Sequence, residues 1–260
     1  MKRIIKICTV IAAAAVIGLG TASCKHGHGG GGGGGGEPVY GGGGGGAPGG
    51  NSPKFISSDA TTDYTTDPNG TALEQAVLNE MNFARTDPSG YVTSRLEPLK
   101  TTSSIHTQYS TTFLTVLDEC IAEMNTMSAL PALTWGGRLR MSAMEWVNIQ
   151  GAGTEREDHG HDPNLQARVS KYCNWTSMGE NLSYGYLTAQ DIVIALIVDD
   201  GVADRGHRYN ILNYAPKNKT TAGTYTHAGV AIGDHGYYGA MSMCAINYAG
   251  GYIDPSLPTP

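Results

Sequence analysis

A block of glycine near the N-terminus limits which part of this chain can fold. Seventeen of the 37 glycines lie in residues 27–50, where they form two uninterrupted runs, 29–36 and 41–46. A segment of this composition buries too little apolar surface to offset the entropy lost on ordering it. The foldable part of the 260-residue chain therefore runs from about residue 59 to about residue 253. That length suits a single domain with a sizeable core, and we place the domain at residues 59–260.

Residues 1–23 have the pattern of a secretory signal, with a positive start, an apolar stretch over 7–19 and small residues at 21–23. The longest apolar run, 10–19, is too short to span a bilayer as a helix. Residues 21–24, Thr-Ala-Ser-Cys, resemble a bacterial lipobox, although Leu is the usual residue at the position of Thr21. The resemblance implies cleavage before Cys24, lipidation of that cysteine and a membrane anchor. Residues 24–58 would then be a glycine-rich tether between the lipid and the domain. The alternative is an ordinary secretory signal.

The charge of the chain argues against nucleic acid as a partner. The formal net charge is −6, and it becomes −9 once Lys2, Arg3 and Lys6 leave with the signal. No basic stripe remains that could follow a phosphate backbone. We therefore expect an exported protein, held at the bacterial envelope by its lipid or otherwise secreted.

Export also determines what the cysteines can do. Cys8 lies in the signal and Cys24 would carry the lipid, so Cys120, Cys173 and Cys244 remain. Three cysteines in an oxidising compartment allow at most one disulfide among them. The sequence alone does not select the pair, and we favour Cys173 with Cys244.

Apolar periodicity predicts helices first and strands last. Helical spacing appears over residues 73–84, 112–130 and 133–150. Thr188 and Asp191 have the spacing of a capping box and open a helix that ends at 199–201. Residues 228–232 and 238–248 have the character of strands, joined by a hairpin signal at 233–236. Without a repeating βαβ unit, this order predicts an α+β fold with helices packed on an antiparallel sheet.

Several short motifs occur along the second half of the chain, and their order is informative. They are Gly-Glu-Asn-Leu at 179–182, Asp-Asp-Gly-Val at 199–202, Arg-Gly-His-Arg-Tyr-Asn-Ile-Leu at 205–212, Ala-Gly-Val-Ala-Ile at 228–232 and Asn-Tyr at 247–248. Earlier pieces at 78–85 and 133–143 agree with them. Together they resemble the CAP superfamily of cysteine-rich secretory, antigen-five and pathogenesis-related proteins, in its bacterial SCP-like branch. The resemblance covers about residues 71–252 and implies a three-layer α-β-α sandwich with a central antiparallel sheet.

The resemblance also implies a surface cleft lined by two histidines and two acids, where some family members bind a divalent metal. Glu180 of Gly-Glu-Asn-Leu matches the first acid, and His207 matches the second histidine. The first histidine precedes the Gly-Glu-Asn motif and is His161, with His159 as the alternative. We expect His161 and Glu180 on loops and His207 near the start of a helix.

The second acid departs from the family pattern. The family often has Glu at the end of the preceding helix, where this chain has Asp199 and Asp200. Aspartate is shorter by one methylene, so the site is expected to be wider. Two neutral imidazoles and two carboxylates form a donor set suited to Zn²⁺. The structural alternative is that the histidine at the helix start caps that helix or joins a salt bridge, while the glutamate braces a loop.

Three functions follow from these observations. The first is an anchored binding module, with a divalent cation in the cleft and, as the resemblance implies, sterols or other lipids in grooves. The second is a metal-assisted hydrolase of the peptidase kind, in which His161, Glu180 and His207 are essential. The third is a surface-displayed protein whose cleft is vestigial and whose partner is another surface protein.

Overall fold

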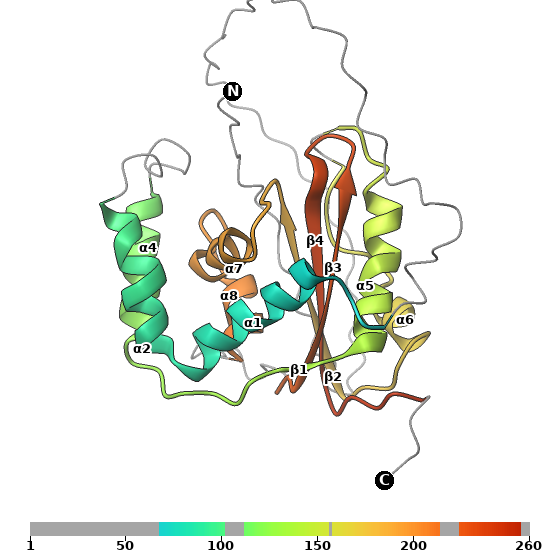
Figure 1. Cartoon of the computed structure of the whole chain (residues 1–260), viewed down its shortest axis with the longest axis horizontal. Helices are drawn as coiled ribbons and strands as arrows, with labels where there is room; N and C mark the ends of the chain where they lie inside the picture. The colour runs from blue at the N-terminus through green and yellow to red at the C-terminus, as the bar shows by residue number, and fades with distance from the viewer. Residues whose placement is uncertain (1–67, 102–111, 156–157, 214–223, 256–260) are drawn as a thin grey trace, which may run out of the picture. The chain divides into compact units, whose positions relative to one another are not determined.

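The computed structural model describes residues 68–101, 112–155, 158–213 and 224–255. The predicted signal segment (1–23) and the tether with Cys24 (24–58) lie outside these residues. The described part contains helices and a four-stranded sheet, which confirms the predicted α+β class (Figure 1). Its elements are α1 (Ala72–Thr86), α2 (Pro88–Tyr91), the π-helix η1 (Val92–Leu96), the 3₁₀-helix η2 (Glu97–Lys100), α4 (Phe113–Met124), β1 (Thr134–Trp135), α5 (Gly137–Gln150), α6 (Leu165–Ser170), β2 (Ser177–Tyr184), α7 (Ala189–Val198), α8 (Gly206–Leu212), β3 (His227–His235) and β4 (Gly239–Gly250).

Helix α1 begins and ends where local chemistry requires. The hydroxyl of Thr71 accepts the N–H of Glu74, and the Glu74 carboxylate accepts the N–H of Thr71, so two backbone donors are satisfied by one capping box. The helix ends at Thr86, close to the predicted end. The chain then continues through α2, η1 and η2, which the sequence did not predict. Pro88 stands at the first position of α2, where the amide N–H that it lacks would have no helical partner.

The sheet is mixed, which corrects the expectation of a wholly antiparallel one. Its strand order is β1-β3-β4-β2, and β4 runs antiparallel to both β3 and β2. Strand β1 pairs with β3 in parallel, with Thr134 opposite His227 and Trp135 opposite Ala228. A parallel neighbour is possible here because the whole of α5, α6, β2, α7 and α8 lies between these two strands in the sequence.

The third predicted helix, over 133–150, is too long at its start. Residues 134–135 form β1 instead, and α5 begins at Gly137. The amide of Gly136 donates to the carbonyl of Ala228 at 2.8 Å, which holds this segment extended against β3. Gly229 opposite it carries no Cβ, and a methyl group there would collide with the backbone of Arg140 in the first turn of α5. The predicted hairpin is confirmed, with longer strands and its turn at 236–238.

Side chains of β4 alternate between two packing environments. Cys244 belongs to the largest apolar cluster, together with residues of α1, α4 and α7. Its neighbour Ala245 packs instead with Ala143 and Val147 of α5. Since successive strand residues point to opposite faces, α5 covers one face of the sheet and the α1–α4–α7 group the other. Figure 1 shows the same division, with α5 and α6 on one side of β3 and β4.

A buried ion pair ties three elements together. The guanidinium of Arg140 in α5 contacts the carboxylate of Glu74 in α1 at 3.1 Å, and both side chains are fully buried. The same carboxylate accepts the backbone N–H of Ile232 in β3 at 2.9 Å. Each charge is therefore both paired and hydrogen-bonded, as burial of ions demands.

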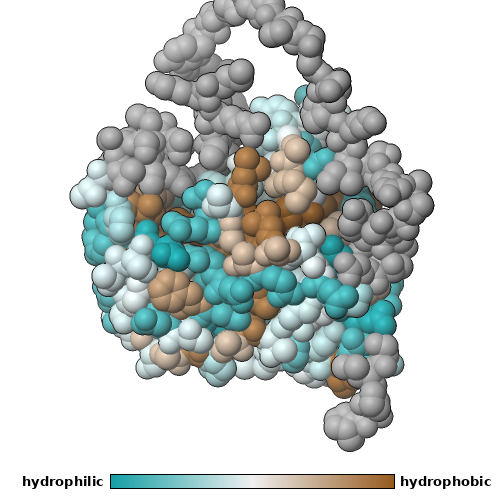
Figure 2. Space-filling view, viewed as in Figure 1, coloured by the Kyte–Doolittle hydropathy of each residue, from teal (hydrophilic) through white to brown (hydrophobic). Residues whose placement is uncertain are grey.

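None of the helices in the described residues is long and apolar enough to cross a bilayer. Figure 2 shows one face of the molecule, on which apolar areas of limited extent alternate with hydrophilic residues. Among the described residues, the large apolar side chains that are exposed are Leu114, Ile149, Leu187, Tyr237 and Ile253.

Candidate functional site

The candidate site is built around β2, the outer strand of the sheet beside β4. Glu180 lies in this strand opposite Asn247, so the prediction that it sits on a loop is wrong. The strand is buried over almost its whole length, although it carries the polar residues Glu180, Asn181 and Ser183. Asn210 of α8 donates to the Glu180 carbonyl at 3.2 Å and to the Asn181 side chain at 2.8 Å, which fastens α8 to this edge.

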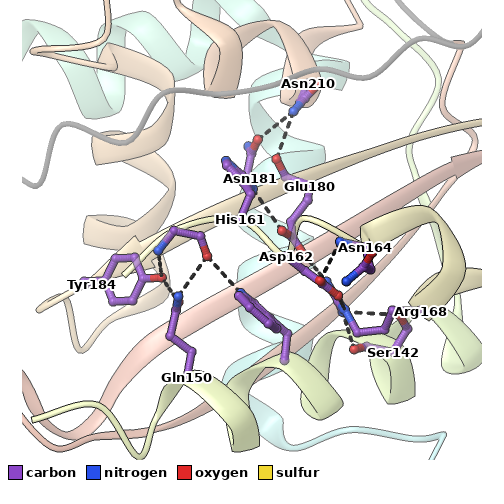
Figure 3. Close-up of polar contacts among 12 residues, drawn as sticks. Ser142, Gln150, His161, Asp162, Asn164, Arg168, Glu180, Asn181, Tyr184 and Asn210 are labelled. Atoms are coloured by element: carbon purple, nitrogen blue, oxygen red, sulfur yellow. Dashed lines mark hydrogen bonds and ion pairs between the residues drawn. The ribbon is translucent and has the colours of Figure 1, made fainter. Parts of the chain in front are cut away.

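The first histidine pairs with Glu180. His161 lies between α5 and α6, and its Nδ1 is 2.9 Å from Oε1 of Glu180. The other carboxylate oxygen accepts a hydrogen bond from Arg168 of α6 (Figure 3). The Glu180 side chain is almost fully buried, while 13% of the His161 side chain is exposed. Both oxygens of this carboxylate are therefore occupied by partners within the chain.

The second histidine pairs with an aspartate. Nδ1 of His207 is 2.7 Å from Oδ1 of Asp199, and the other oxygen accepts the backbone N–H of His207 at 3.0 Å. Asp199 follows α7, where Thr188 is the N-cap and accepts the N–H of Asp191 at 3.1 Å, while the Asp191 carboxylate accepts the Thr188 hydroxyl; the cap predicted from the capping-box spacing is confirmed in this half. Asp199 adopts the left-handed conformation, with φ 58°, which turns its carboxylate back toward α8. Such a conformation in a non-glycine residue is costly and is often kept where it positions a functional group.

The two histidines contact neighbouring residues of β2. His161 contacts the Glu180 side chain, whereas the His207 carbonyl accepts a hydrogen bond from the neighbouring Asn181 at 3.0 Å. Their rings meet, with centroids 6.4 Å apart and planes 29° from parallel. Chain segments far apart in the sequence thus bring both predicted histidines together.

Both histidines keep one nitrogen unused. Nε2 of His161 and Nε2 of His207 are buried, and neither has a hydrogen-bond partner among the described residues. Carboxylates accept hydrogen bonds, so Nδ1 is the donor in each pair, and in the neutral imidazole Nε2 is then the nitrogen with the lone pair. A buried acceptor without a donor is unfavourable unless something else contacts it. Two such atoms in neighbouring rings are the distinctive feature of this site.

The remaining predicted residues lie at the margin of this arrangement. Asp200 accepts the hydroxyl of Thr112 at 3.3 Å, and Asp199 is the aspartate that contacts the imidazole. His159 packs edge-on against Tyr184, with centroids 5.8 Å apart, so His161 and not His159 faces Glu180.

A small pocket adjoins His207. Its volume is about 30 Å³, room for one or two water molecules. Polar groups reach it from Ser183, whose buried hydroxyl has no partner in the part of the chain that the structure describes. The pocket is lined by Leu182, Ser183, Tyr184, Tyr186, Ala195, Leu196, Asp199, Asp200, Val202 and His207.

Of the predicted ligands, only the two imidazoles have a nitrogen available to bind a metal ion. No group of three or more histidines, cysteines, aspartates and glutamates gathers within reach of one ion in the described ranges. Glu180 and Asp199 are each committed to an imidazole, which is the arrangement of a carboxylate behind a metal-binding histidine. The two unused Nε2 atoms are the donors that remain for a cation.

The favoured disulfide between Cys173 and Cys244 is not formed. Both are free and buried, as is Cys120. Cys173 packs with Leu139 and Ala249 on the α5 face of the sheet, whereas Cys244 belongs to the cluster on the other face. Burial raises the pKa of the Cys120 thiol to about 12 and that of Cys173 to about 11. These thiols stay protonated at neutral pH and are poor metal ligands.

Sequence reasoning missed Arg168, the residue most involved in holding Glu180. The sequence hinted at this role of Arg168 only through its position, a few residues beyond the polar stretch that contains His161. Asn181 and Asn210 lie inside the Gly-Glu-Asn-Leu and Asn-Ile-Leu motifs, and their mutual hydrogen bond explains how these motifs come together.

Comparisons with protein-family models, with curated proteins and with solved structures yield no match for this chain.

Proposed function

We propose that this chain is an exported, lipid-anchored CAP-like binding module whose paired histidines hold a divalent cation. The motifs along residues 179–212 support the CAP assignment, because their residues are the ones that converge: Glu180, Asn181, Asp199, His207 and Asn210 all lie in one network. The helices on either face of the central strands support the three-layer α-β-α arrangement.

One observation carries the proposal: Nε2 of His161 and Nε2 of His207 are buried and have no hydrogen-bond partner among the described residues. Nε2 atoms oriented by a carboxylate at Nδ1 are the usual histidine ligands of zinc. We therefore assign His161 and His207 as the ligands. Glu180 and Asp199 orient the two imidazoles and do not bind the ion. The resemblance alone had implied that the acids bind the ion directly.

A bound zinc ion would supply a Lewis acid with open positions for water or for an oxygen of a ligand. The protein residues determine what reaches it. His207 borders the small pocket, whose walls are mostly apolar and whose polar groups include the Ser183 hydroxyl. A pocket of this size accepts a small group and not a sterol skeleton, so a lipid ligand would need a different groove.

The anchor completes the proposed function. Cys24 would carry the lipid, and the glycine-rich tether would hold the domain away from the bilayer, exposed to ligands of the envelope or the surroundings. The acidic balance of the chain without its signal suits a cationic ligand better than a polyanion.

A metal-assisted hydrolase is the second candidate, and the position of the pocket beside His207 favours it. A small substrate group seated there would lie beside His207, one of the two residues that would hold the ion. This candidate requires the same two imidazoles, so a failure to bind metal would eliminate it together with the first. A surface interaction protein with a vestigial site would then remain.

Native mass spectrometry of the purified full chain tests the proposal. One zinc equivalent is expected at micromolar added Zn²⁺ and should be lost in the His161→Ala/His207→Ala double variant. His227→Ala is the matched control, since that histidine stacks on Tyr252 at 4.6 Å, away from the pair. Zinc that persists in the double variant, or no zinc in the wild type, would overturn the assignment.

A further inference from the structure

Arg168 is the most heavily engaged residue beside the histidine pair. Its guanidinium is buried, with 2% of the side chain exposed. Nε donates to Asp162 at 2.8 Å, Nη2 donates to Glu180, and Nη1 donates to the carbonyl and hydroxyl of Ser142 in α5. The guanidinium also lies 5.5 Å from the ring of Trp146. Figure 3 shows Arg168 beside Ser142 and Asp162, with Glu180 and His161 nearby.

The contact with Arg168 determines which oxygen of the Glu180 carboxylate faces His161. A guanidinium is always charged and only donates hydrogen bonds. Oε2 of Glu180 therefore accepts from Arg168, while Oε1 of the same carboxylate faces Nδ1 of His161. This arrangement orients the ring with Nδ1 on the carboxylate, so in the neutral imidazole with its proton on Nδ1 the lone pair is on Nε2.

Arg168 also fixes the backbone around His161. It holds Asp162, the next residue, while Trp146 and Gln150 donate to the carbonyl of Gly160, the residue before. These donor distances are 3.0 and 2.9 Å. The segment is thus held on both sides of the histidine, and α6 supplies one side through a single side chain.

The His207 half of the site is held differently. Asp199 receives the imidazole and the backbone N–H of the same residue, so its orientation depends on the turn between α7 and α8. Replacement of Arg168 should therefore disturb the orientation of His161 and leave that of His207 unchanged. This asymmetry makes the role of Arg168 separable from a general loss of structure.

We propose that Arg168 is the positioning residue for His161: through Glu180 and Asp162 it holds the imidazole with Nδ1 on the carboxylate, and so leaves Nε2 as the ring nitrogen that is presented to a ligand. The consequence for metal affinity rests on the proposed function. The consequence for the tautomer of His161 does not, because it concerns the metal-free protein.

Long-range ¹H–¹⁵N NMR of the ¹⁵N-labelled, metal-free full chain tests the tautomer. The wild type should show His161 protonated at Nδ1 and bare at Nε2. In Arg168→Met the His161 signals should move to a mixture of tautomers, while the His207 signals stay unchanged. Arg168→Lys should restore the signals in part, because lysine keeps the charge but not the fork of donors. Arg138→Met is the matched control, since Arg138 pairs with Asp254 at 3.2 Å.

A zinc titration of the same proteins provides the second readout. Arg168→Met should bind zinc about tenfold to a hundredfold more weakly than the wild type, as for other residues behind a metal ligand. His161 protonated at Nε2 in the wild type would overturn the proposal without any variant. So would an Arg168→Met chain whose His161 signals match those of the wild type. If no protein binds zinc while the tautomer shifts as expected, the proposed function fails and the role of Arg168 stands.

Discussion

The rings of His161 and His207 stack 6.4 Å apart, and each is held at Nδ1 by a different carboxylate. The site therefore consists of two similar halves that meet beside β2. Glu180 serves one half and Asp199 the other. Because each half has its own support, each can be altered without touching the other.

The two adjacent aspartates should behave differently. In Asp199→Asn the amide cannot accept from both the imidazole and the backbone N–H of His207, so the ring loses its fixed orientation. We expect zinc affinity to fall about tenfold to a hundredfold, measured by calorimetric titration. Asp200→Asn is the matched control, since its carboxylate accepts from Thr112, and its effect should be much smaller. Equal losses in both variants would contradict the assignment.

The buried ion pair between α1 and α5 should dominate stability. Arg140→Met leaves the Glu74 carboxylate buried without its counter-charge, which costs about 3–5 kcal/mol of unfolding free energy. Urea unfolding of the full chain followed by circular dichroism measures it. Arg138→Met removes a more exposed pair with Asp254 and should cost only about 0–1 kcal/mol. Similar losses in the two variants would show that burial of the Glu74–Arg140 pair is unimportant.

The buried thiols should be unreactive in the folded chain. The pKa of Cys120 is raised to about 12 and that of Cys173 to about 11, in both cases mainly through desolvation. Iodoacetamide at pH 8 should label these two cysteines slowly in native protein and rapidly in denaturant, with peptide mapping as the readout. A disulfide-linked Cys173–Cys244 peptide in freshly purified protein would contradict the free thiols.

The same shifts make stability depend on alkaline pH. A thiol whose pKa is raised by folding favours the folded state fully below the unfolded value, which is about 9. That contribution is lost as the pH rises from about 9 toward the raised values of about 11 and 12. The unfolding free energy should therefore decline across this range, and Cys120→Ala should flatten the decline. An unchanged slope in that variant would assign the alkaline loss to other groups, such as the buried tyrosines.

Ser183→Ala tests whether a water or ligand contacts the Ser183 hydroxyl in the pocket beside His207. Its buried hydroxyl has no partner in the described residues, so removing it should leave stability unchanged or raise it by up to about 1 kcal/mol. Ser142→Ala is the contrasting variant, because the Ser142 hydroxyl accepts from Arg168, and it should lose stability. Thermal unfolding compares the two. A clear loss in Ser183→Ala would indicate that a water or ligand occupies the pocket in solution.

Local sequence patterns predicted the helices α1 and α7 and the β3–β4 hairpin. Residues 73–84 and the cap at Thr188 gave α1 and α7, because apolar spacing and capping chemistry act within a few residues. The β3–β4 hairpin was likewise visible from its strands and turn. Strands β1 and β2 were missed, since β1 is two residues long and β2 is buried on both sides.

The site was predictable in its residues but not in its contacts. His161, Glu180, Asp199 and His207 all came from motif resemblance, and the structure brings them together as two pairs. The part played by Arg168 depends on how α6 packs against β2. No short-range pattern encodes that packing. The wrong disulfide has the same origin, because the face of the sheet that a cysteine occupies is set by tertiary contacts.

X-ray absorption of the zinc-loaded full chain tests the central claim most directly, because it counts the ligands by type. Two imidazole nitrogens are expected at about 2.0–2.1 Å, completed by light oxygen donors and with no sulfur. A shell with sulfur, or one with a single imidazole or none, would contradict a centre formed by His161 and His207.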